Sequence, residues 1–139
     1  MEYTENVFTK IVRKELPADI LYEDDQTLAF LDHAPVSPGH TLVIPKKQVV
    51  NIFDVDDETL AAVMRTVRKV AEAVRNATGA KGVHINSNHG TEAGQVVPHL
   101  HFHIIPRHKR EEFDFWKHTT YVSTETKDAL AKDIRDRLA

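Results

Sequence analysis

The longest amphipathic segment of the chain begins at an acidic cluster at residues 54–58 and ends at Gly79. Carboxylates favour the first turn of a helix, where the helix dipole attracts negative charge, and glycine favours the position just after its end. The pattern predicts a long helix with one apolar face, which must be buried against something else. That face consists of Leu60, Val63, Met64, Val67, Val70, Ala71 and Val74.

Shorter apolar runs lie on both sides of this helix. Residues 7–15 have helical spacing up to Pro17, which predicts a short helix with Phe8 facing inward. Residues 27–31 and 41–44 are strand-like and are joined by a turn-rich stretch, so we expect an antiparallel pair. Further elements are a strand at 83–86 and a C-terminal helix opened by Ser123 or Thr124, with Leu130, Ile134 and Leu138 spaced by four.

These elements favour an α+β fold, because strands occur both before and after the long helix. We expect an antiparallel sheet covered by that helix, together with a short N-terminal helix and a C-terminal helix. The 139 residues fit one domain, with a core at about 6–107 and a tail at 108–139.

The charge and composition of the chain argue against several classes of function. A formal charge of −3 provides no basic field for nucleic acid, and the chain has no cysteine for disulfides or thiolate metal sites. No apolar run approaches the length of a membrane span, and the N-terminus lacks a signal-like pattern. We therefore expect a cytoplasmic protein with a small-molecule partner and with neither a nucleic-acid nor a membrane partner.

The most informative motif is a row of three histidines that alternate with apolar residues within residues 98–106. Successive side chains of a strand point to opposite faces, so His99, His101 and His103 are predicted to share one face. Histidine can act as a base, an acid, a nucleophile or a metal ligand. The row therefore predicts a working surface more readily than a stripe of hydrogen-bonded core histidines.

The middle histidine is best placed to attack a phosphorus atom. Attack by neutral His101 would form an easily hydrolysed phosphorus–nitrogen bond, which divides one difficult displacement into two easier ones. His99 and His103 would fix its tautomer, polarise the phosphoryl oxygens and help protonate the leaving group. Two alternatives stay open. One is a metal-dependent hydrolase that uses the His-x-His strand, although no carboxylate lies on this strand or just before it. The other is a non-catalytic purine nucleotide-binding module.

Residues 99–105 fit His-φ-His-φ-His-φ-φ, where φ is apolar, and so resemble the histidine triad (HIT) family of nucleotide hydrolases and transferases. Residues 39–46 resemble the family's second block, and Ala93-Gly94-Gln95 precedes the triad as expected. Residues 7–15 through 28–32 are especially similar to the nucleoside phosphoramidases called histidine triad nucleotide-binding proteins, and bacterial members with a longer tail are equally similar. The resemblance implies a HIT-like fold.

The resemblance also implies an activity. In that family the middle histidine, which corresponds to His101, takes a nucleoside monophosphate from a phosphoramidate, a dinucleoside polyphosphate or an acyl adenylate, and water releases an AMP-like product. The outer pair correspond to His99 and His103, and the family's fourth histidine to His40. The reaction requires no cofactor or metal in the catalytic site.

The resemblance also implies which residues contact the nucleotide. Asp32 corresponds to the acid that binds both ribose hydroxyls. The base pocket would have apolar walls, and the phosphate side would have amide side chains and backbone donors. The walls correspond to Val7, Phe8, Ile11, Phe30 and Leu42, and the phosphate side to Asn88, Gln95 and the 94–97 segment, with Gly94 and Val97 at its ends.

The chain departs from the family pattern in two ways. Val96 stands where phosphoramidases often have a serine that contacts the scissile bridge. In some bacterial relatives, a structural zinc uses two cysteines, a later histidine and the first triad histidine, whereas this chain has Asn6, Thr9 and Gln48 at the first three positions. We therefore predict no zinc there, with that corner held by packing alone.

The family is typically a homodimer, and the same is expected here. Phe113, Phe115 and Trp116 would either close the partner's pocket or pack on their own subunit. The other histidines, His33, His84, His89, His108 and His118, are predicted to be surface or loop residues.

Overall fold

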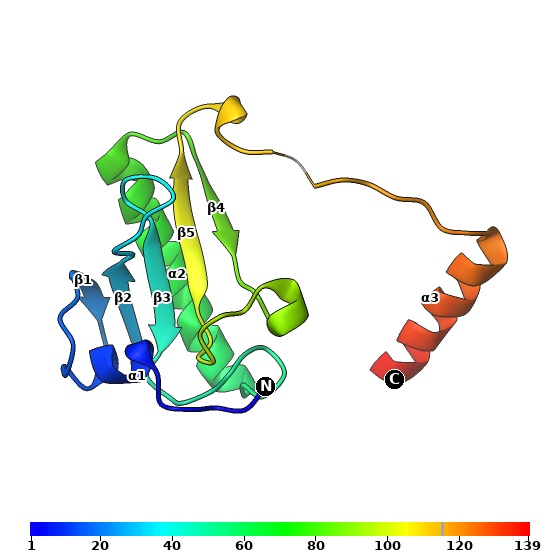
Figure 1. Cartoon of the computed structure of the whole chain (residues 1–139), viewed down its shortest axis with the longest axis horizontal. Helices are drawn as coiled ribbons and strands as arrows, with labels where there is room; N and C mark the ends of the chain where they lie inside the picture. Colours follow the sequence, from blue (N-terminus) through cyan, green and yellow to red (C-terminus); the bar gives the residue numbers. More distant parts are fainter. Residues whose placement is uncertain (115) are drawn as a thin grey trace.

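A computed structural model describes residues 1–114 and 116–139. Its centre is a five-stranded antiparallel sheet in the order β1-β2-β3-β5-β4, with the long helix α2 across one face (Figure 1). The predicted α+β class is confirmed. The elements are α1 (Val7–Val12), β1 (Ile20–Glu23), β2 (Thr27–Leu31), β3 (Thr41–Pro45), α2 (Asp57–Thr78), β4 (Gly82–Asn86), η1 (Thr91–Ala93), β5 (Phe102–Arg107), η2 (Arg110–Glu112) and α3 (Thr124–Leu138).

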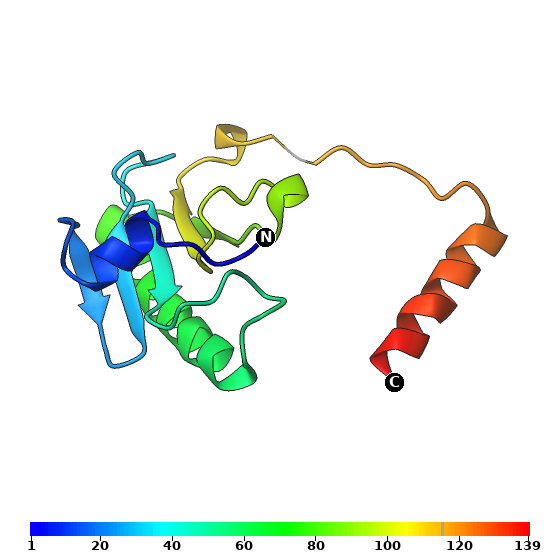
Figure 2. The ribbon, with the colours of Figure 1, turned by 60° about the horizontal axis from the view of Figure 1, so that its bottom comes forward.

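The neighbouring strands β2 and β3 are buried on both faces, so their side chains divide between two cores. Figure 2 shows the reason: α1 and α2 lie on opposite sides of the sheet. Odd and even positions of a strand point to opposite faces, and each set is apolar here. The α2 core contains Ala29, Val43, Ile104 and Val67, among others, and the α1 core contains Phe8, Ile11, Leu28, Phe30, Leu42 and Ile44.

The predicted long helix is confirmed with its caps. The Asp56 side chain accepts a hydrogen bond from the Thr59 N–H at the start, and Gly79 adopts a left-handed φ of 73° at the end. The first helix is shorter than predicted, because α1 ends at Val12 rather than at residue 15. Lys14 turns the chain with a φ of 64°, and the Glu15 N–H donates back to the Lys10 carbonyl.

The strand that carries the histidine row begins later than predicted. β5 begins at Phe102, so only His103 of the three histidines lies within it. The His99 N–H donates to the Val97 carbonyl at 2.9 Å, and the Leu100 N–H donates to the Val49 carbonyl at 2.9 Å. These backbone groups are therefore bonded to loops, and a sheet ladder cannot use them.

The predicted C-terminal helix is confirmed as α3, with the Ser123 side chain accepting from the Thr126 N–H. Figures 1 and 2 both show α3 apart from the sheet, at the end of an extended segment. None of its residues is buried, although Leu130, Ile134 and Leu138 form its apolar positions. No helix in the described residues is both long and apolar enough to span a bilayer.

Gly39, which precedes His40, gives a first testable prediction. Its φ is +99°, and an added Cβ would lie 2.7 Å from Thr78 Cγ2 on α2. We expect Gly39→Ala to lower the free energy of unfolding by about 3 kcal/mol, because backbone strain and a clash add. Gly79→Ala is the matched control, since its φ is +73° but nothing lies within 4 Å, and about 1 kcal/mol is expected. Equal losses in urea unfolding would contradict this account.

Candidate active site

A cavity of about 330 Å³ lies where α1, the β2 and β3 strands and the loop around η1 meet. It brings together His101, His103 and all the predicted nucleotide contacts except Gln95. His33 and Val96 also line it, although His33 was predicted only as a surface or loop residue. The lining residues are Val7, Phe8, Ile11, Phe30, Asp32, His33, Leu42, Asn88, Gly94, Val96, Val97, His101 and His103.

His101 is fixed in one tautomer by the backbone. Its Nδ1 lies 2.6 Å from the His99 carbonyl oxygen, and because a carbonyl only accepts, Nδ1–H must donate. The lone pair of neutral His101 is therefore on Nε2. His101 is 8% exposed, and its ring packs edge-to-face with that of Phe8 at a centroid distance of 5.0 Å. Burial lowers the pKa of His101, which favours this neutral, nucleophilic form.

His103 and His40 form a hydrogen-bonded pair beside His101. The Val36 N–H donates to His40 Nδ1 at 3.1 Å, so the proton of neutral His40 is on Nε2. His40 Nε2 then donates to His103 Nδ1 at 2.9 Å, which leaves the proton of neutral His103 on its own Nε2. Burial lowers the pKa of both rings. The pair thus provides an N–H donor at His103. The ring centroids of His103 and His101 are 5.2 Å apart.

Asp32 closes the cavity at the end of β2. Its Oδ1 accepts from the Ala34 N–H at 2.9 Å, which is the turn contact typical of aspartate, and its Oδ2 lies 3.6 Å from His40 Nε2. The loop that follows is tied to β5, because the Ser37 hydroxyl donates to the Pro106 carbonyl at 2.8 Å. Asp32 therefore has a fixed position with its carboxylate at the cavity wall.

His99 does not line the cavity, although the Phe8 ring packs edge-on against both His99 and His101. Its Nε2–H donates to the Pro45 carbonyl at 2.8 Å, so Nδ1 accepts from the Tyr3 hydroxyl at 2.9 Å. Tyr3 in turn hydrogen-bonds the Thr9 hydroxyl. Both ring nitrogens are thus occupied in a fully buried side chain. His99 acts on the site through its backbone carbonyl, which orients His101.

The same contacts correct the expectation for the corner where some relatives hold zinc. Packing alone was expected there. Instead, Thr9, Tyr3 and His99 form a chain of hydrogen bonds, and the Asn6 side chain caps α1 by accepting from the Phe8 and Thr9 N–H groups. Hydrogen bonds between side chains stabilise this corner in addition to packing.

Gln95 also has a different place from the one predicted. It is 3% exposed and braces the loop before the triad. Its Oε1 accepts from the Gly90 N–H and the Asn51 amide, and its Nε2 donates to the Val50 and Val97 carbonyls. With these four contacts the amide is fully used, so Gln95 positions the phosphate-side loop without facing the cavity.

Comparisons with known proteins show the family of this chain. The HIT domain model matches residues 13–110. The chain belongs to the HIT family. This HIT chain is 41% identical over 135 residues to adenosine 5'-monophosphoramidase of Schizosaccharomyces pombe, covering 95% of this chain and 97% of that protein. It is 42% identical over 105 residues to an adenylylsulfatase of Arabidopsis thaliana, covering 76% of this chain and 53% of that protein.

The HIT fold itself is confirmed by a solved structure. A crystal structure of a HIT family protein from Bacillus subtilis matches with a TM-score of 0.87 and 37% sequence identity, covering 96% of both chains. The resemblance that the histidine motif suggested therefore extends over nearly the whole chain, including the C-terminal segment.

One group of side chains in this HIT site has metal-ligand spacing. The ligand atoms of Asp32, His40 and His103 all lie within 4.8 Å of one another. The sequence argument against a metal relied on the absence of a carboxylate from the histidine strand, and the fold supplies one from the end of β2. Among the residues that the structure describes, these three have the ligand atoms and spacing to hold a divalent cation.

Three supporting contacts were not predicted. The Ser87 hydroxyl donates to the His101 carbonyl at 2.6 Å, Tyr3 orients His99, and the Val36 N–H sets the His40 tautomer. Serine and tyrosine in loops carry no periodic signal, and a backbone donor carries none in the sequence. Pairing of these groups with the histidines is visible only once the strands are placed.

The aromatic residues of the tail have different environments. Phe113 packs edge-on against His84 of its own chain at a centroid distance of 4.3 Å, whereas Trp116 is 90% exposed. Phe115 lies outside the described residues. Of the remaining histidines, His89 accepts from the Ile52 N–H at 3.0 Å.

Acid is expected to destabilise this HIT fold. Burial lowers the pKa of five histidines below the ordinary value of 6.5: His40, His89, His99, His101 and His103. The unfolded chain therefore binds more protons below pH 6.5, so stability is complete above that pH and falls as pH decreases, by up to about 1.4 kcal/mol per pH unit for each histidine.

Urea unfolding at pH 7, 6 and 5 measures this loss. His33→Asn is the matched control, because the His33 side chain is 98% exposed and its replacement should leave the pH dependence unchanged. An unfolding free energy that stays constant from pH 7 to pH 5 would contradict burial of neutral histidines.

Proposed function

We propose that this chain is a nucleotide hydrolase or nucleotidyl transferase that cleaves at the α-phosphate through a covalent intermediate on His101. The observation that carries the proposal is the tautomer of His101, whose Nδ1–H is bonded to the His99 carbonyl. The nucleophilic nitrogen, Nε2, is thereby left with its lone pair in a cavity shared with His103 and Asp32. Family membership and the two named enzymes among its relatives support the same class of reaction.

The reaction takes two displacements. His101 Nε2 attacks the α-phosphorus, the bond to the leaving group breaks, and the bonding electrons leave with that group. His103 Nε2–H donates to a phosphoryl oxygen as charge develops, and the His40–His103 bond holds that donor in place. Water then attacks phosphorus and loses a proton to solvent, the phosphorus–nitrogen bond breaks with its electron pair returning to Nε2, and neutral His101 is regenerated with release of the nucleoside monophosphate.

The walls of the cavity suit a nucleoside. Asp32 presents a carboxylate that can accept from both ribose hydroxyls. Phe8, Phe30 and Leu42 belong to the apolar α1 core and also line the cavity, so one surface serves both packing and the base. This arrangement supports a planar base, and adenine is our proposal because both named relatives act on adenosine compounds.

The leaving-group side has one distinctive feature. Val96 is 86% exposed at the cavity rim and has no hydrogen-bonding side chain. Protonation of an amine leaving group therefore gets no help from this position, where related phosphoramidases often have serine.

The test is AMP release from adenosine 5'-phosphoramidate, followed with and without a chelator. Turnover that persists in chelator is the expected result. Activity that disappears with chelator and returns with zinc or manganese would favour a metal-dependent hydrolase using Asp32, His40 and His103. Tight AMP binding with no turnover of any nucleotide would favour a binding module.

We also propose that the chain is a homodimer, as its family is. The β4 strand lies at one edge of the sheet, where its outer backbone groups are open to pairing with a second strand. Light scattering at micromolar concentration should give the mass of two chains, and a monomer would contradict the proposal.

A further inference from the structure

An apolar groove lies between α2 and β1, the strand at the opposite edge of the sheet from β4. We call it the β1-edge groove. Its volume is about 330 Å³, and it shares no lining residue with the active-site cavity. The α2 residues that line it extend from Lys69 to Thr78. Most of its wall is apolar and consists of Leu21, Tyr22, Val70, Ala73, Val74 and Ala77.

The C-terminal helix α3 carries an apolar stripe that is open to solvent. Leu130, Ile134 and Leu138 are 47%, 50% and 80% exposed, and no residue of α3 is buried. Two ion pairs, each between residues four apart, lie within α3 itself. A helix of 15 residues is only marginally stable alone in water. We therefore expect the stripe to be covered in the assembled protein.

The stripe and the β1-edge groove match in length and shape. The stripe extends eight residues from Leu130 to Leu138, which is about 12 Å along a helix, and the groove extends nine residues from Lys69 to Thr78, about 14 Å. Ala73 and Ala77 are one turn apart on α2, and small side chains at such positions let a second helix approach closely. The larger side chains of the stripe can therefore enter between α2 and β1.

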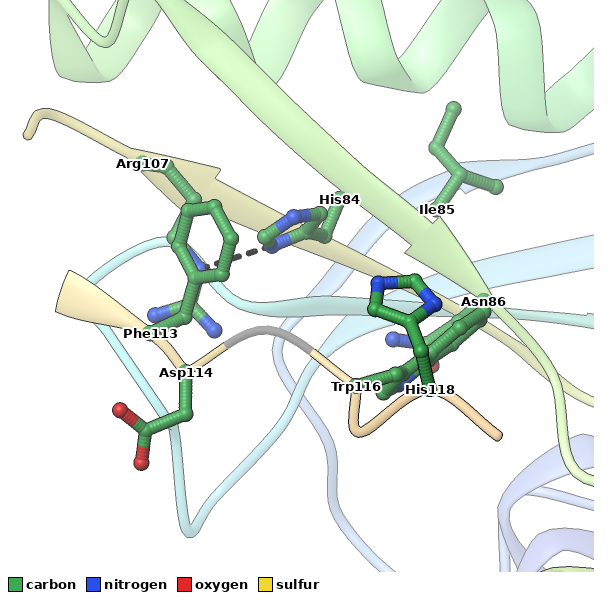
Figure 3. Close-up of a pocket in the computed structure, with 8 residues that line it drawn as sticks. All are labelled: His84, Ile85, Asn86, Arg107, Phe113, Asp114, Trp116 and His118. Atoms are coloured by element: carbon green, nitrogen blue, oxygen red, sulfur yellow. Dashed lines mark hydrogen bonds between the residues drawn. The ribbon is translucent and has the colours of Figure 1, made fainter. Parts of the chain in front are cut away.

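The segment that carries α3 leads away from the groove of its own chain. Phe113 packs against His84 of β4 at a centroid distance of 4.3 Å, so this segment begins at the β4 edge (Figure 3). Figure 1 shows α3 beyond β4, whereas β1 lies at the opposite edge of the sheet. The groove that α3 approaches is therefore not the one beside its own β1.

A second copy paired at β4 brings its own groove within reach. Because the sheet has five strands, the second copy's β1 would lie five inter-strand steps from this β4, which is about 24 Å. Phe113 and Ser123 are ten residues apart, and ten residues extend at most about 35 Å. The segment is long enough to cross the sheet of the second copy and to place α3 beside its β1 edge.

We infer that α3 of a second copy docks in the β1-edge groove, with two such helices exchanged in each two-fold symmetric dimer. The inference rests on the proposed homodimer. Leu31 and Gly39 also line the groove, and they directly precede Asp32 and His40 in the chain. The docked helix thus lies behind the nucleotide site, and each subunit supports the segment that holds Asp32 and His40 in the other.

Cross-linking tests the docking directly, because the chain has no cysteine of its own. Tagged Ile134→Cys protein is co-expressed with untagged Ala73→Cys protein, purified through the tag and treated with a short bismaleimide. The expected product joins one tagged chain to one untagged chain. Glu72→Cys in place of Ala73→Cys is the matched control, since Glu72 is exposed on α2 but does not line the groove, and much less product is expected.

A polar substitution in the stripe gives a second test. Ile134→Gln has Arg135→Gln as its matched control, because both side chains are exposed in the single chain and a helix free in solvent predicts equal effects. Docking predicts that Ile134→Gln raises the dissociation constant of the dimer about tenfold and the Kd for AMP about threefold. Arg135→Gln should change both within about twofold, and circular dichroism checks that α3 stays helical.

The outcomes are distinct. A chain with both Ala73→Cys and Ile134→Cys that links only within itself, when diluted with wild-type chain, would place α3 on its own subunit and overturn the inference. Equal effects of Ile134→Gln and Arg135→Gln on dimer dissociation would overturn it too, and an unchanged Kd for AMP in Ile134→Gln would overturn the support of the site. A wild-type dimer without the expected cross-link would overturn only this inference. A wild-type monomer would overturn the proposed homodimer as well, and wild-type protein that binds no AMP would overturn the proposed function.

Discussion

Replacing His101 with alanine is expected to lower the rate of AMP release by about 10⁴-fold or more, because the substitution removes the nucleophile itself. The first displacement then has no nitrogen to form the phosphorus–nitrogen bond. The other parts of the cavity remain, since Asp32 and His103 are placed by β2 and β5 independently of the His101 ring. AMP affinity should therefore change much less than the rate, and single-turnover assays and calorimetry on the same preparations measure both.

His108→Ala is the matched control for this variant. His108 is an exposed histidine close to the triad in sequence, and its hydrogen bond uses only its backbone N–H. Its replacement should leave the rate within about twofold. A His101→Ala protein that retains wild-type turnover would show that the attacking group lies elsewhere.

Replacing His103 with alanine is expected to lower kcat by about 10²- to 10³-fold, the usual effect of removing one donor that stabilises charge in the transition state. His103 donates through Nε2 because His40 occupies its Nδ1. The effect should fall on kcat more than on KM, since the charge on the phosphoryl oxygens grows during the displacement.

The pairing gives this prediction an internal check. His40→Asn removes the ring that donates to His103 Nδ1, so the proton of His103 is no longer confined to Nε2 and an intermediate loss is expected. A His103→Ala variant with kcat within threefold of wild type would contradict the donor role. A larger loss of kcat in His40→Asn than in His103→Ala would contradict the proposal that His40 acts through His103.

Much of this fold could be predicted because its signals are local. The α2 helix begins and ends where an acidic cap and Gly79 predict, and β2 and β3 pair as their apolar runs indicate. The inward position of Phe30 and Leu42 was predictable for the same reason, since they lie on apolar strands, whereas their assignment to a base pocket came from the family resemblance and stays a prediction.

The errors have a common physical cause, which is competition for backbone and side-chain hydrogen bonds. Period-two alternation at the triad predicts a strand from His99 onward, but the His99 and Leu100 N–H groups are bonded to loops and the strand begins at Phe102. His99 and Gln95 have the right residue types for a phosphate site. Their polar atoms are instead occupied by partners distant in sequence, such as Tyr3 and Val50, which no local pattern reveals.

The central claim, a nucleotidyl group carried on His101, is tested most directly by trapping that intermediate. Wild-type protein is mixed with adenosine 5'-phosphoramidate, quenched under alkaline conditions that preserve a phosphorus–nitrogen bond, digested and analysed by mass spectrometry. The account predicts one adenylyl group on the peptide that contains His101, absent from His101→Ala protein and lost on acid treatment. An adenylyl group on a different residue, or rapid turnover with no trapped adduct at any time point, would contradict it.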